Sequence, residues 1–192
     1  MQPTYLFASV LTAATFVIVP ASAQQMLTGD VKLACEATLC LASGTRPQEC
    51  MPSLRRYFSI SYRRFVDTVR GRINFLKLCP SANQSPQMAA LVEAIANGAG
   101  QCNAATLNVT TLVMQTGGGD SVTFISNQLP DYCSAYLGNQ YTNLGGSTPK
   151  YVGSPLRGGY WVNASDFDAA LAAYNARIAA EDLALSNSLG RN

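Results

Sequence analysis

Residues 28–50 read TGDVKLACEATLCLASGTRPQEC and place three of the six cysteines of the chain on one predicted helix and the turn behind it. Apolar and small residues recur at helical spacing from Asp30 to Leu41, and Asp30 is the expected N-cap. Gly44 and Pro47 follow as stop signals for a helix. The stretch therefore predicts a helix over residues 30–41 and a turn that leads to Cys50.

The first 23 residues have the pattern of a secretory signal peptide. They carry no charged side chain, and their nearly continuous apolar run from Leu6 to Val19 is followed by an A-x-A motif at residues 21–23. The alternative is an uncleaved membrane anchor, but a run of about 14 residues is shorter than the roughly 20 that span a bilayer. We therefore expect residues 1–23 to be cleaved and residues 24–192 to form a single domain, which in a bacterium would be periplasmic.

All the cysteines follow this predicted signal peptide. They are Cys35, Cys40, Cys50, Cys79, Cys102 and Cys133. An even number of thiols in an exported chain is normally paired, so we expect three disulfides. Cys35 and Cys40 cannot pair, because five residues along a helix separate Cα atoms by more than the roughly 7 Å that a disulfide tolerates.

Twelve of the fifteen connectivities of six cysteines then remain. Among them we favour Cys40–Cys50, Cys79–Cys102 and Cys35–Cys133. The chain has no C-x-x-C pair of the redox type. The alternative to structural bridges is an all-thiolate zinc site drawn from Cys35, Cys40, Cys50 and Cys79.

The remaining pattern predicts a mainly α, small disulfide-stabilised domain. A second helix is expected at Glu49–Phe58, and a fourth continues from Pro86 through Met88–Ala96 with Ser85 as its N-cap. The third, of about 16 residues, is predicted from an apolar stripe that should face the core. The stripe consists of Tyr62, Phe65, Val66, Val69, Ile73 and Leu76. A close helix contact is expected at Gly71.

The second half of the chain gives a weaker pattern until its last helix. Leu107–Met114 and Ser121–Leu129 each fit a helix or a strand. Residues 144–160, with five glycines and two prolines, predict a loop, and residues 164–185 predict a C-terminal helix. Trp161, the only tryptophan of the chain, lies between them. It could line a recognition groove, but we favour a turn whose aromatic residues cover the last helix.

The chain contains no histidine, which excludes Ser-His-Asp and Cys-His catalysis and histidine zinc sites. Carboxylate catalysis, as in glycan cleavage, remains open, and Glu36 is the one candidate acid that we identify. A surface glutamate on a helix is the simpler interpretation. We therefore expect a protein that is not an enzyme and needs no cofactor or metal. The alternatives are a cell-wall glycan hydrolase that uses Glu36 and an exported, toxin-like growth inhibitor.

Positive charge is concentrated between residues 46 and 77. Eight basic residues lie there against two acidic ones, although the net charge of the whole chain is only +2. The basic residues are Arg46, Arg55, Arg56, Arg63, Arg64, Arg70, Arg72 and Lys77. A solvated surface is the simpler interpretation. The functional one is a docking surface for an acidic protein, an anionic lipid surface or a cell-wall polymer, with nucleic acid less favoured.

Residues 28–103 contain a series of short motifs. They are TGD at 28–30, LACEA at 33–37, LCL at 39–41, SGTRP at 43–47, EC at 49–50, LRRYFSI at 54–60, FL at 75–76, LCP at 78–80 and AIANG at 94–98. Their combination resembles the N-terminal signature of the TrbM/KikA family of conjugative plasmids. The resemblance implies an exported accessory protein of a type IV secretion system that acts in the periplasm during plasmid transfer, and it brings no catalytic motif. It also implies a partner in the cell envelope, which the basic helices would contact, with the protein acting alone or as a homodimer.

Overall fold

The computed structural model describes residues 27–117 and 120–190, so the predicted signal peptide of residues 1–23 lies outside the described residues. The chain is mainly helical, as predicted. The α-helices are α1 (Gly29–Ala42), α2 (Met51–Phe58), α3 (Phe65–Leu76), α4 (Pro86–Gly98), α5 (Ala104–Thr110), α6 (Asp131–Leu137) and α7 (Phe167–Leu189). The strands are β1 (Leu112–Gly117), β2 (Asp120–Ile125), β3 (Pro149–Val152) and β4 (Tyr160–Asn163).

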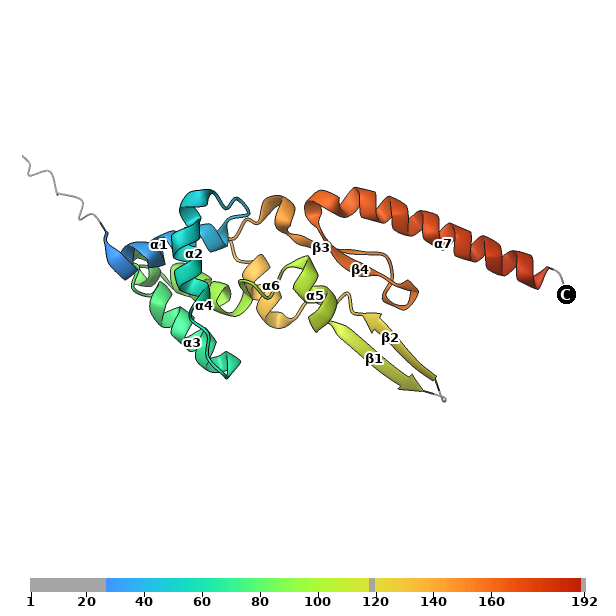
Figure 1. The fold of residues 1–192 in the computed structure, drawn as a ribbon, viewed down its shortest axis with the longest axis horizontal. Helices are drawn as coiled ribbons and strands as arrows, with labels where there is room; N and C mark the ends of the chain where they lie inside the picture. The colour runs from blue at the N-terminus through green and yellow to red at the C-terminus, as the bar shows by residue number, and fades with distance from the viewer. Residues whose placement is uncertain (1–26, 118–119, 191–192) are drawn as a thin grey trace, which may run out of the picture.

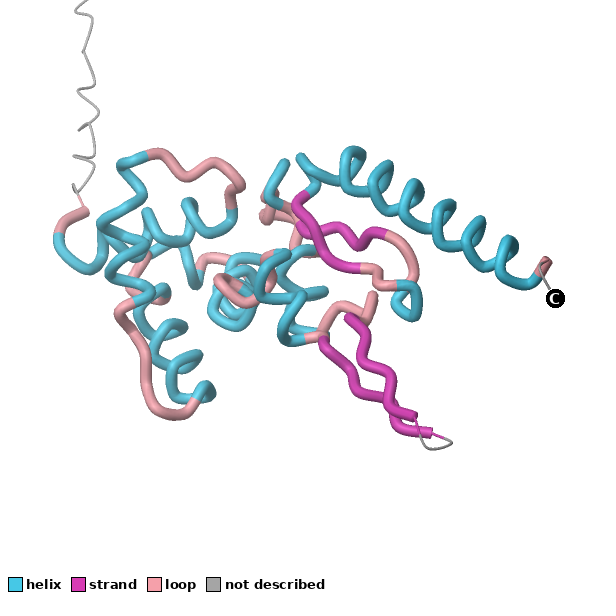
Figure 2. The backbone as a smooth tube through the Cα atoms, turned by 45° about the vertical axis from the view of Figure 1, so that its right-hand side comes forward, coloured by secondary structure: helices cyan, strands magenta, loops and turns pink. Residues whose placement is uncertain are grey.

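The molecule is elongated, with the first four helices at one end and α7 extending at the other (Figure 1). Strands β1 and β2 pair as an antiparallel hairpin that projects from the body, and β3 and β4 form a second antiparallel hairpin beside α7 (Figures 1 and 2). Helices α1 to α4 and α6 pack on one another, and α5 lies against β4. The predicted basic segment and the C-terminal helix therefore lie at opposite ends.

Two buried tyrosines are part of the core at the helical end and form hydrogen bonds to backbone carbonyls there. Tyr57 is fully buried, and its hydroxyl donates to the carbonyl of Ile95 at 3.1 Å. The hydroxyl of Tyr136 donates to the carbonyl of Leu41 at 2.5 Å. Burial raises the pKa of both phenols above the ordinary value. These bonds satisfy the polar tips of the two rings, so the rings can fill the core without leaving an unpaired hydroxyl.

The six cysteines form three disulfides, of which we predicted one. Cys40–Cys50 is confirmed, with a Cα–Cα distance of 5.9 Å. The predicted Cys79–Cys102 and Cys35–Cys133 bridges are wrong. The structure pairs Cys35 with Cys79 at 4.8 Å and Cys102 with Cys133 at 5.3 Å. No cysteine is left free among the described residues, which hold all six, so the alternative all-thiolate zinc site does not form.

The two wrong disulfide predictions have a geometric cause. Cys79 precedes α4 and Cys102 follows it, and a helix of 13 residues separates its two ends by about 20 Å. Cys79 meets Cys35 instead, because the end of α3 packs on α1. Cys133 lies on α6, which packs on α4, and it therefore reaches the cysteine that follows α4.

The third helix is shorter than predicted, and part of its predicted core stripe is exposed. It begins at Phe65, whereas Tyr62 lies in the preceding loop. Tyr62, Phe65 and Val66 are exposed by 59%, 48% and 66%. The residues of α3 that are buried are Thr68, Val69, Arg72, Phe75 and Leu76.

The loop before α3 explains this difference. The Thr68 hydroxyl accepts from the Tyr62 amide at 2.8 Å and so folds the loop back on the helix. A Cβ atom at Gly71 would lie 2.8 Å from side-chain atoms of both Ile60 and Tyr62. Gly71 therefore permits a close contact, as expected, but the neighbour is this loop rather than another helix.

Two predicted capping residues have different outcomes. The Ser85 hydroxyl accepts from the Met88 amide at 3.2 Å and caps α4, as predicted. Asp30 lies in the first turn of α1 rather than at its N-cap, which is Thr28. Both positions suit a carboxylate, because the amides of a first helical turn are unpaired.

The predicted loop over residues 144–160 is wrong in part, because it contains β3 and leads into β4. These strands pair in antiparallel register, with Tyr151 opposite Trp161. Trp161 is 5% exposed, and its indole N–H donates to the carbonyl of Ser126 at 3.0 Å. The predicted turn before Trp161 is therefore confirmed at Pro155–Arg157 and Gly158, but Trp161 itself lies in β4. Glycines with positive φ at positions 153 and 158 join the strands, which explains why the segment resembled a loop.

Of the two ambiguous segments, the first divides into α5 and β1, and the second begins as β2. The predicted C-terminal helix is confirmed, since a 3₁₀ turn over Ala164–Asp166 leads into α7. Tyr174 of α7 is buried against Gly153, where a Cβ atom would lie 2.2 Å from its ring. Beyond residue 178, every described residue of α7 is exposed.

Removal of the longest bridge should destabilise the domain most. In a Cys35→Ser/Cys79→Ser variant, we expect the free energy of unfolding to fall by about 4 kcal/mol, because the bridge spans 44 residues of sequence. Removal of Cys40–Cys50, which spans 10 residues, should cost about 3 kcal/mol. Urea denaturation of the oxidised proteins measures both values. A larger loss for the short bridge would contradict this ranking.

Candidate docking surface

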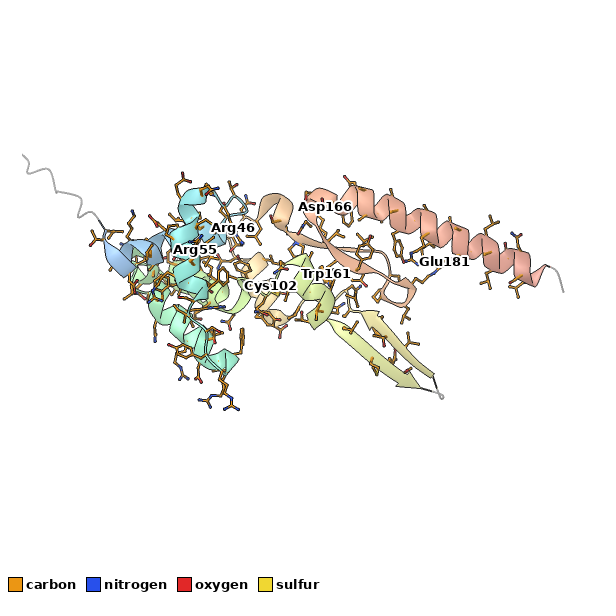
Figure 3. The ribbon with its side chains drawn as sticks, in the orientation of Figure 1. Arg46, Arg55, Cys102, Trp161, Asp166 and Glu181 are labelled. Carbon is orange, nitrogen blue, oxygen red and sulfur yellow. A yellow bond between two sulfur atoms is a disulfide. The ribbon has the colours of Figure 1, made fainter. Side chains whose placement is uncertain are left out.

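Five of the eight predicted basic residues are exposed on α2, α3 and the segments that flank α3. They are Arg55, Arg63, Arg64, Arg70 and Lys77. Figure 3 shows Arg55 on α2, at the end of the molecule opposite Glu181 on α7. We call these five residues the basic surface. The other three predicted residues, Arg46, Arg56 and Arg72, have different surroundings.

Arg72 is part of the core packing and not of the surface. It is 8% exposed, and its guanidinium lies 4.8 Å from the ring centre of Tyr57 and 5.4 Å from that of Phe58. Its Nε donates to the carbonyl of Ile60 at 3.3 Å. Stacking on two aromatic faces and one hydrogen bond stabilise this cation away from bulk water. The sequence-based assignment of Arg72 to a docking surface is therefore wrong.

Arg56 is partly buried and ties α2 to α1. Its Nε donates to Oδ1 of Asp30 at 3.1 Å, and its Nη2 donates to Oδ2 at 2.8 Å. The same guanidinium lies 5.0 Å from the ring centre of Phe75. The hydrogen bonds from Arg56 hold the pKa of Asp30 below its ordinary value. Because Asp30 neutralises it, Arg56 adds little to the field of the basic surface.

The basic surface itself is poorly neutralised. Arg64 and Arg70 share one carboxylate, that of Asp67, at 2.8 and 3.9 Å. Within residues 27–117 and 120–190, Arg55, Arg63 and Lys77 have no ion-pair partner. Two of the five cations thus share one carboxylate and the other three are unpaired within the described ranges, so the positive charge that remains is available to a partner.

Exposed apolar side chains and a groove accompany this charge. Tyr62, Phe65 and Val66 are exposed, and so is Leu78, by 45%. A shallow groove of about 330 Å³ lies along α3. It is lined by Arg56, Ile60, Tyr62, Gly71, Asn74, Phe75 and Leu78. The groove and the exposed apolar side chains beside it were not predicted from the sequence. The available signal was the width of the apolar pattern of α3, which exceeds what one buried face needs.

Arg46 lies apart from the basic surface, in the loop after α1 (Figure 3). It is exposed and borders a cavity of about 280 Å³, together with Gly100, Asn103 and Tyr136. A second, wider depression of about 660 Å³ shares Gly44, Leu144 and Ser147 with this cavity. Arg46 therefore belongs to a hollow of mixed polar and apolar lining rather than to the predicted basic surface.

Glu36, the candidate acid for glycan cleavage, lies on α1. Its carboxylate forms an ion pair with Nζ of Lys32 one helical turn earlier, at 3.6 Å, and its side chain is 35% exposed. This is the arrangement that the simpler interpretation of a surface glutamate expects. In the described part of the chain, no three Cys, Asp or Glu side chains are grouped so that they could hold a metal ion.

None of the helices within the described ranges has the length and apolar character needed to cross a membrane.

In a comparison with protein families, the model described as TrbM matches residues 26–175. The matched range includes all six cysteines, the basic surface, both hairpins and the first part of α7. Neither the curated proteins nor the solved structures that were searched include a match to the chain.

The ion pair between Asp30 and Arg56 should contribute to stability in a pH-dependent way. Because the pKa of Asp30 is lowered in the folded state, its contribution is present above the ordinary aspartate pKa of about 3.9 and is lost as the pH falls through the lowered value. An Asp30→Asn variant should therefore unfold at a lower urea concentration than the wild type near neutral pH. This difference should shrink as the pH falls below about 4.

Urea titrations of the wild type, Asp30→Asn, Arg56→Gln and the double variant measure this effect. We expect the double variant to lose less stability than the sum of the two single variants, because each single variant already removes the interaction between Asp30 and Arg56. Additive losses would contradict a direct pairing of the two side chains.

Proposed function

This chain belongs to the TrbM family, and from that premise we propose that it is a non-enzymatic accessory protein of plasmid conjugation, exported to the periplasm and associated with a type IV secretion system. It acts by docking on another protein of the cell envelope. The single observation that carries the proposal is the basic surface, where one carboxylate, that of Asp67, is the only ion-pair partner of five exposed cations among the described residues. The family supplies the conjugation context, and the surface supplies a means of binding.

The disulfides support a docking role because they hold the helices that bear the charges. Cys79 lies three residues after the end of α3 and is bonded to α1, and Cys50 precedes α2 and is also bonded to α1. The basic side chains thus project from α2, α3 and the segments that flank α3, whose ends are tied to α1. A surface that is rigid before binding loses less conformational entropy when its partner arrives.

The chemistry of the surface favours an acidic protein over nucleic acid. Single-stranded nucleic acid is bound by cations together with exposed aromatic rings on which bases stack. Here Tyr57 is fully buried, and the ring of Phe58 lies under the guanidinium of Arg72. Two of the four aromatic residues within the basic sequence are therefore committed to packing. The other two, Tyr62 and Phe65, are exposed, but Tyr62 shares a groove with the apolar Leu78, which suits a protein segment better than stacked bases.

Reversal of the unpaired charges should impair conjugation. We expect an Arg63→Glu/Lys77→Glu variant to lower plasmid transfer by about tenfold or more, because charge pairs with an acidic partner become repulsive. The matched control is Lys32→Glu/Lys150→Glu, which changes the net charge equally outside the basic surface. Transfer frequency in matings, with the envelope level of each variant measured by immunoblot, is the readout. Equal transfer by wild type and variant would refute the docking surface.

The non-enzymatic part of the proposal has its own test. Purified, oxidised protein should leave peptidoglycan intact in a zymogram, and a Glu36→Gln variant should support normal plasmid transfer. A lysozyme lane shows that the gel detects cleavage. Clearing by the wild type that is absent from Glu36→Gln would instead establish a glycan hydrolase.

A further inference from the structure

We propose that the groove along α3 binds an amphipathic, acidic helix of the partner protein. This inference rests on the proposed function, because the groove adjoins the basic surface and would hold the same partner. It goes further by stating which part of the surface is apolar, which secondary structure occupies it and what pattern the bound segment carries.

The groove has the length and direction of a helix-binding site. Gly71, Asn74, Phe75 and Leu78 line it and stand at positions i, i+3, i+4 and i+7, which is one face of a helix. Their positions span about 10 Å along the axis of α3 and its last turn. Ile60 and Tyr62 of the preceding loop form the opposite wall. The groove therefore runs parallel to α3 between a helix and a folded-back loop.

The walls of the groove are mainly apolar, and two of them are accessible. Tyr62 is 59% exposed and Leu78 is 45% exposed, and both line the groove. One apolar face of α3 already packs in the core through Val69, Phe75 and Leu76. The exposed residues are thus not needed to hold the helix in place. Contiguous exposed apolar area of this kind is typical of interaction sites.

The occupant must satisfy its own backbone hydrogen bonds. The groove is formed by side chains of α3 and a loop, and the backbone groups of α3 are already paired within the helix. An extended strand would therefore find no ladder partner there, whereas a helix brings its backbone groups already paired. Helices bind such grooves through apolar residues at i, i+3 or i+4, and i+7. This spacing matches the two-turn length of the groove.

The charge around the groove selects an acidic helix. Lys77 follows the end of α3, and Arg63 and Arg64 precede its start. Arg56, in the wall, already has Asp30 as its partner. Asp67, the nearby carboxylate of α3, is shared by two arginines. A basic helix would be repelled here. Glutamates and aspartates beside the apolar anchors would find the unpaired cations Lys77, next to Leu78 in the chain, and Arg63, next to Tyr62.

A designed peptide tests the site directly. The probe is a fluorescein-labelled helix of about 18 residues with leucines at i, i+3, i+4 and i+7 and glutamates at most other positions. Fluorescence anisotropy with the oxidised mature protein should show saturable binding. A scrambled peptide of the same composition should bind at least about tenfold more weakly, because it cannot place its leucines in the groove. Equal binding of both peptides would overturn the proposal.

Substitutions in the groove test whether the peptide binds there. Leu78→Ser and Tyr62→Ser should each weaken peptide binding by about tenfold, because they remove apolar walls. Leu185→Ser is the matched control, since Leu185 is 60% exposed at the far end of the molecule. Circular dichroism and urea denaturation show that each variant is folded. A wild-type affinity of both groove variants would overturn the proposal, and so would Leu78-dependent binding to phosphatidylglycerol vesicles without peptide binding.

The plasmid-transfer frequencies of two variants distinguish a failure of the groove proposal from a failure of the proposed function. Reduced transfer by both Arg63→Glu/Lys77→Glu and Leu78→Ser supports the basic surface and the groove together. If charge reversal lowers transfer but Leu78→Ser does not, the docking surface stands and the groove is wrong. Normal transfer by both variants refutes both. A photo-cross-linker at position 78 should attach to an acidic helical segment, and attachment to a second copy of this chain or to lipid would refute the stated occupant.

Discussion

The Cys35–Cys79 bridge is the constraint on which the helical end of the molecule depends. It joins Cys35, in the middle of α1, to Cys79, three residues after the end of α3. The bridge spans 44 residues of sequence, so α2 and α3 are contained in one covalent loop. Closing such a loop reduces the entropy of the unfolded chain by an amount worth about 4 kcal/mol. That is a large part of the 5–15 kcal/mol by which domains are typically stable. With α1 and α3 fixed together, Arg72 of α3 stacks on Tyr57 of α2, and the loop before α3 folds back over Gly71.

The far end of the molecule is built differently, with short hairpins and no bridge of its own. Cys102–Cys133 joins the end of α4 to α6, and the hairpin of β3 and β4 continues the body from there. Tyr174 packs on Gly153, and Arg157 donates to Asp182 at 2.6 Å. These contacts hold the first part of α7, and the helix then continues past the last of them. The elongated shape follows from this division between a cross-linked helical end and a lightly packed one (Figures 1 and 2).

Local chemistry was predictable from the sequence, and long-range packing was not. Ser85 before Pro86 specifies the start of α4, and Cys40–Cys50 closes a short turn next to a helix, so both follow from neighbours in the chain. Cys35–Cys79 depends on which helices pack together, which cysteine spacing does not encode. The apolar pattern of α3 indicates a helix, but it cannot say which of two apolar faces becomes buried. The hairpin of β3 and β4 was missed because its glycine turns dominate a segment whose strands have only four residues each.

The candidate site shows the same limit, because a count of charges in sequence does not separate structural cations from available ones. Eight basic residues formed one group along the chain, yet Arg72 is stacked on two rings and Arg56 is held by Asp30. Both cations hold the helices together, and the folded chain exposes the others on top of that framework. Tyr62 and Leu78 stay exposed beside them because the apolar core of α3 is already filled by its other face. An apolar groove beside unpaired cations leaves two kinds of unsatisfied surface in one place. A single partner segment that is both apolar and acidic would satisfy both at once.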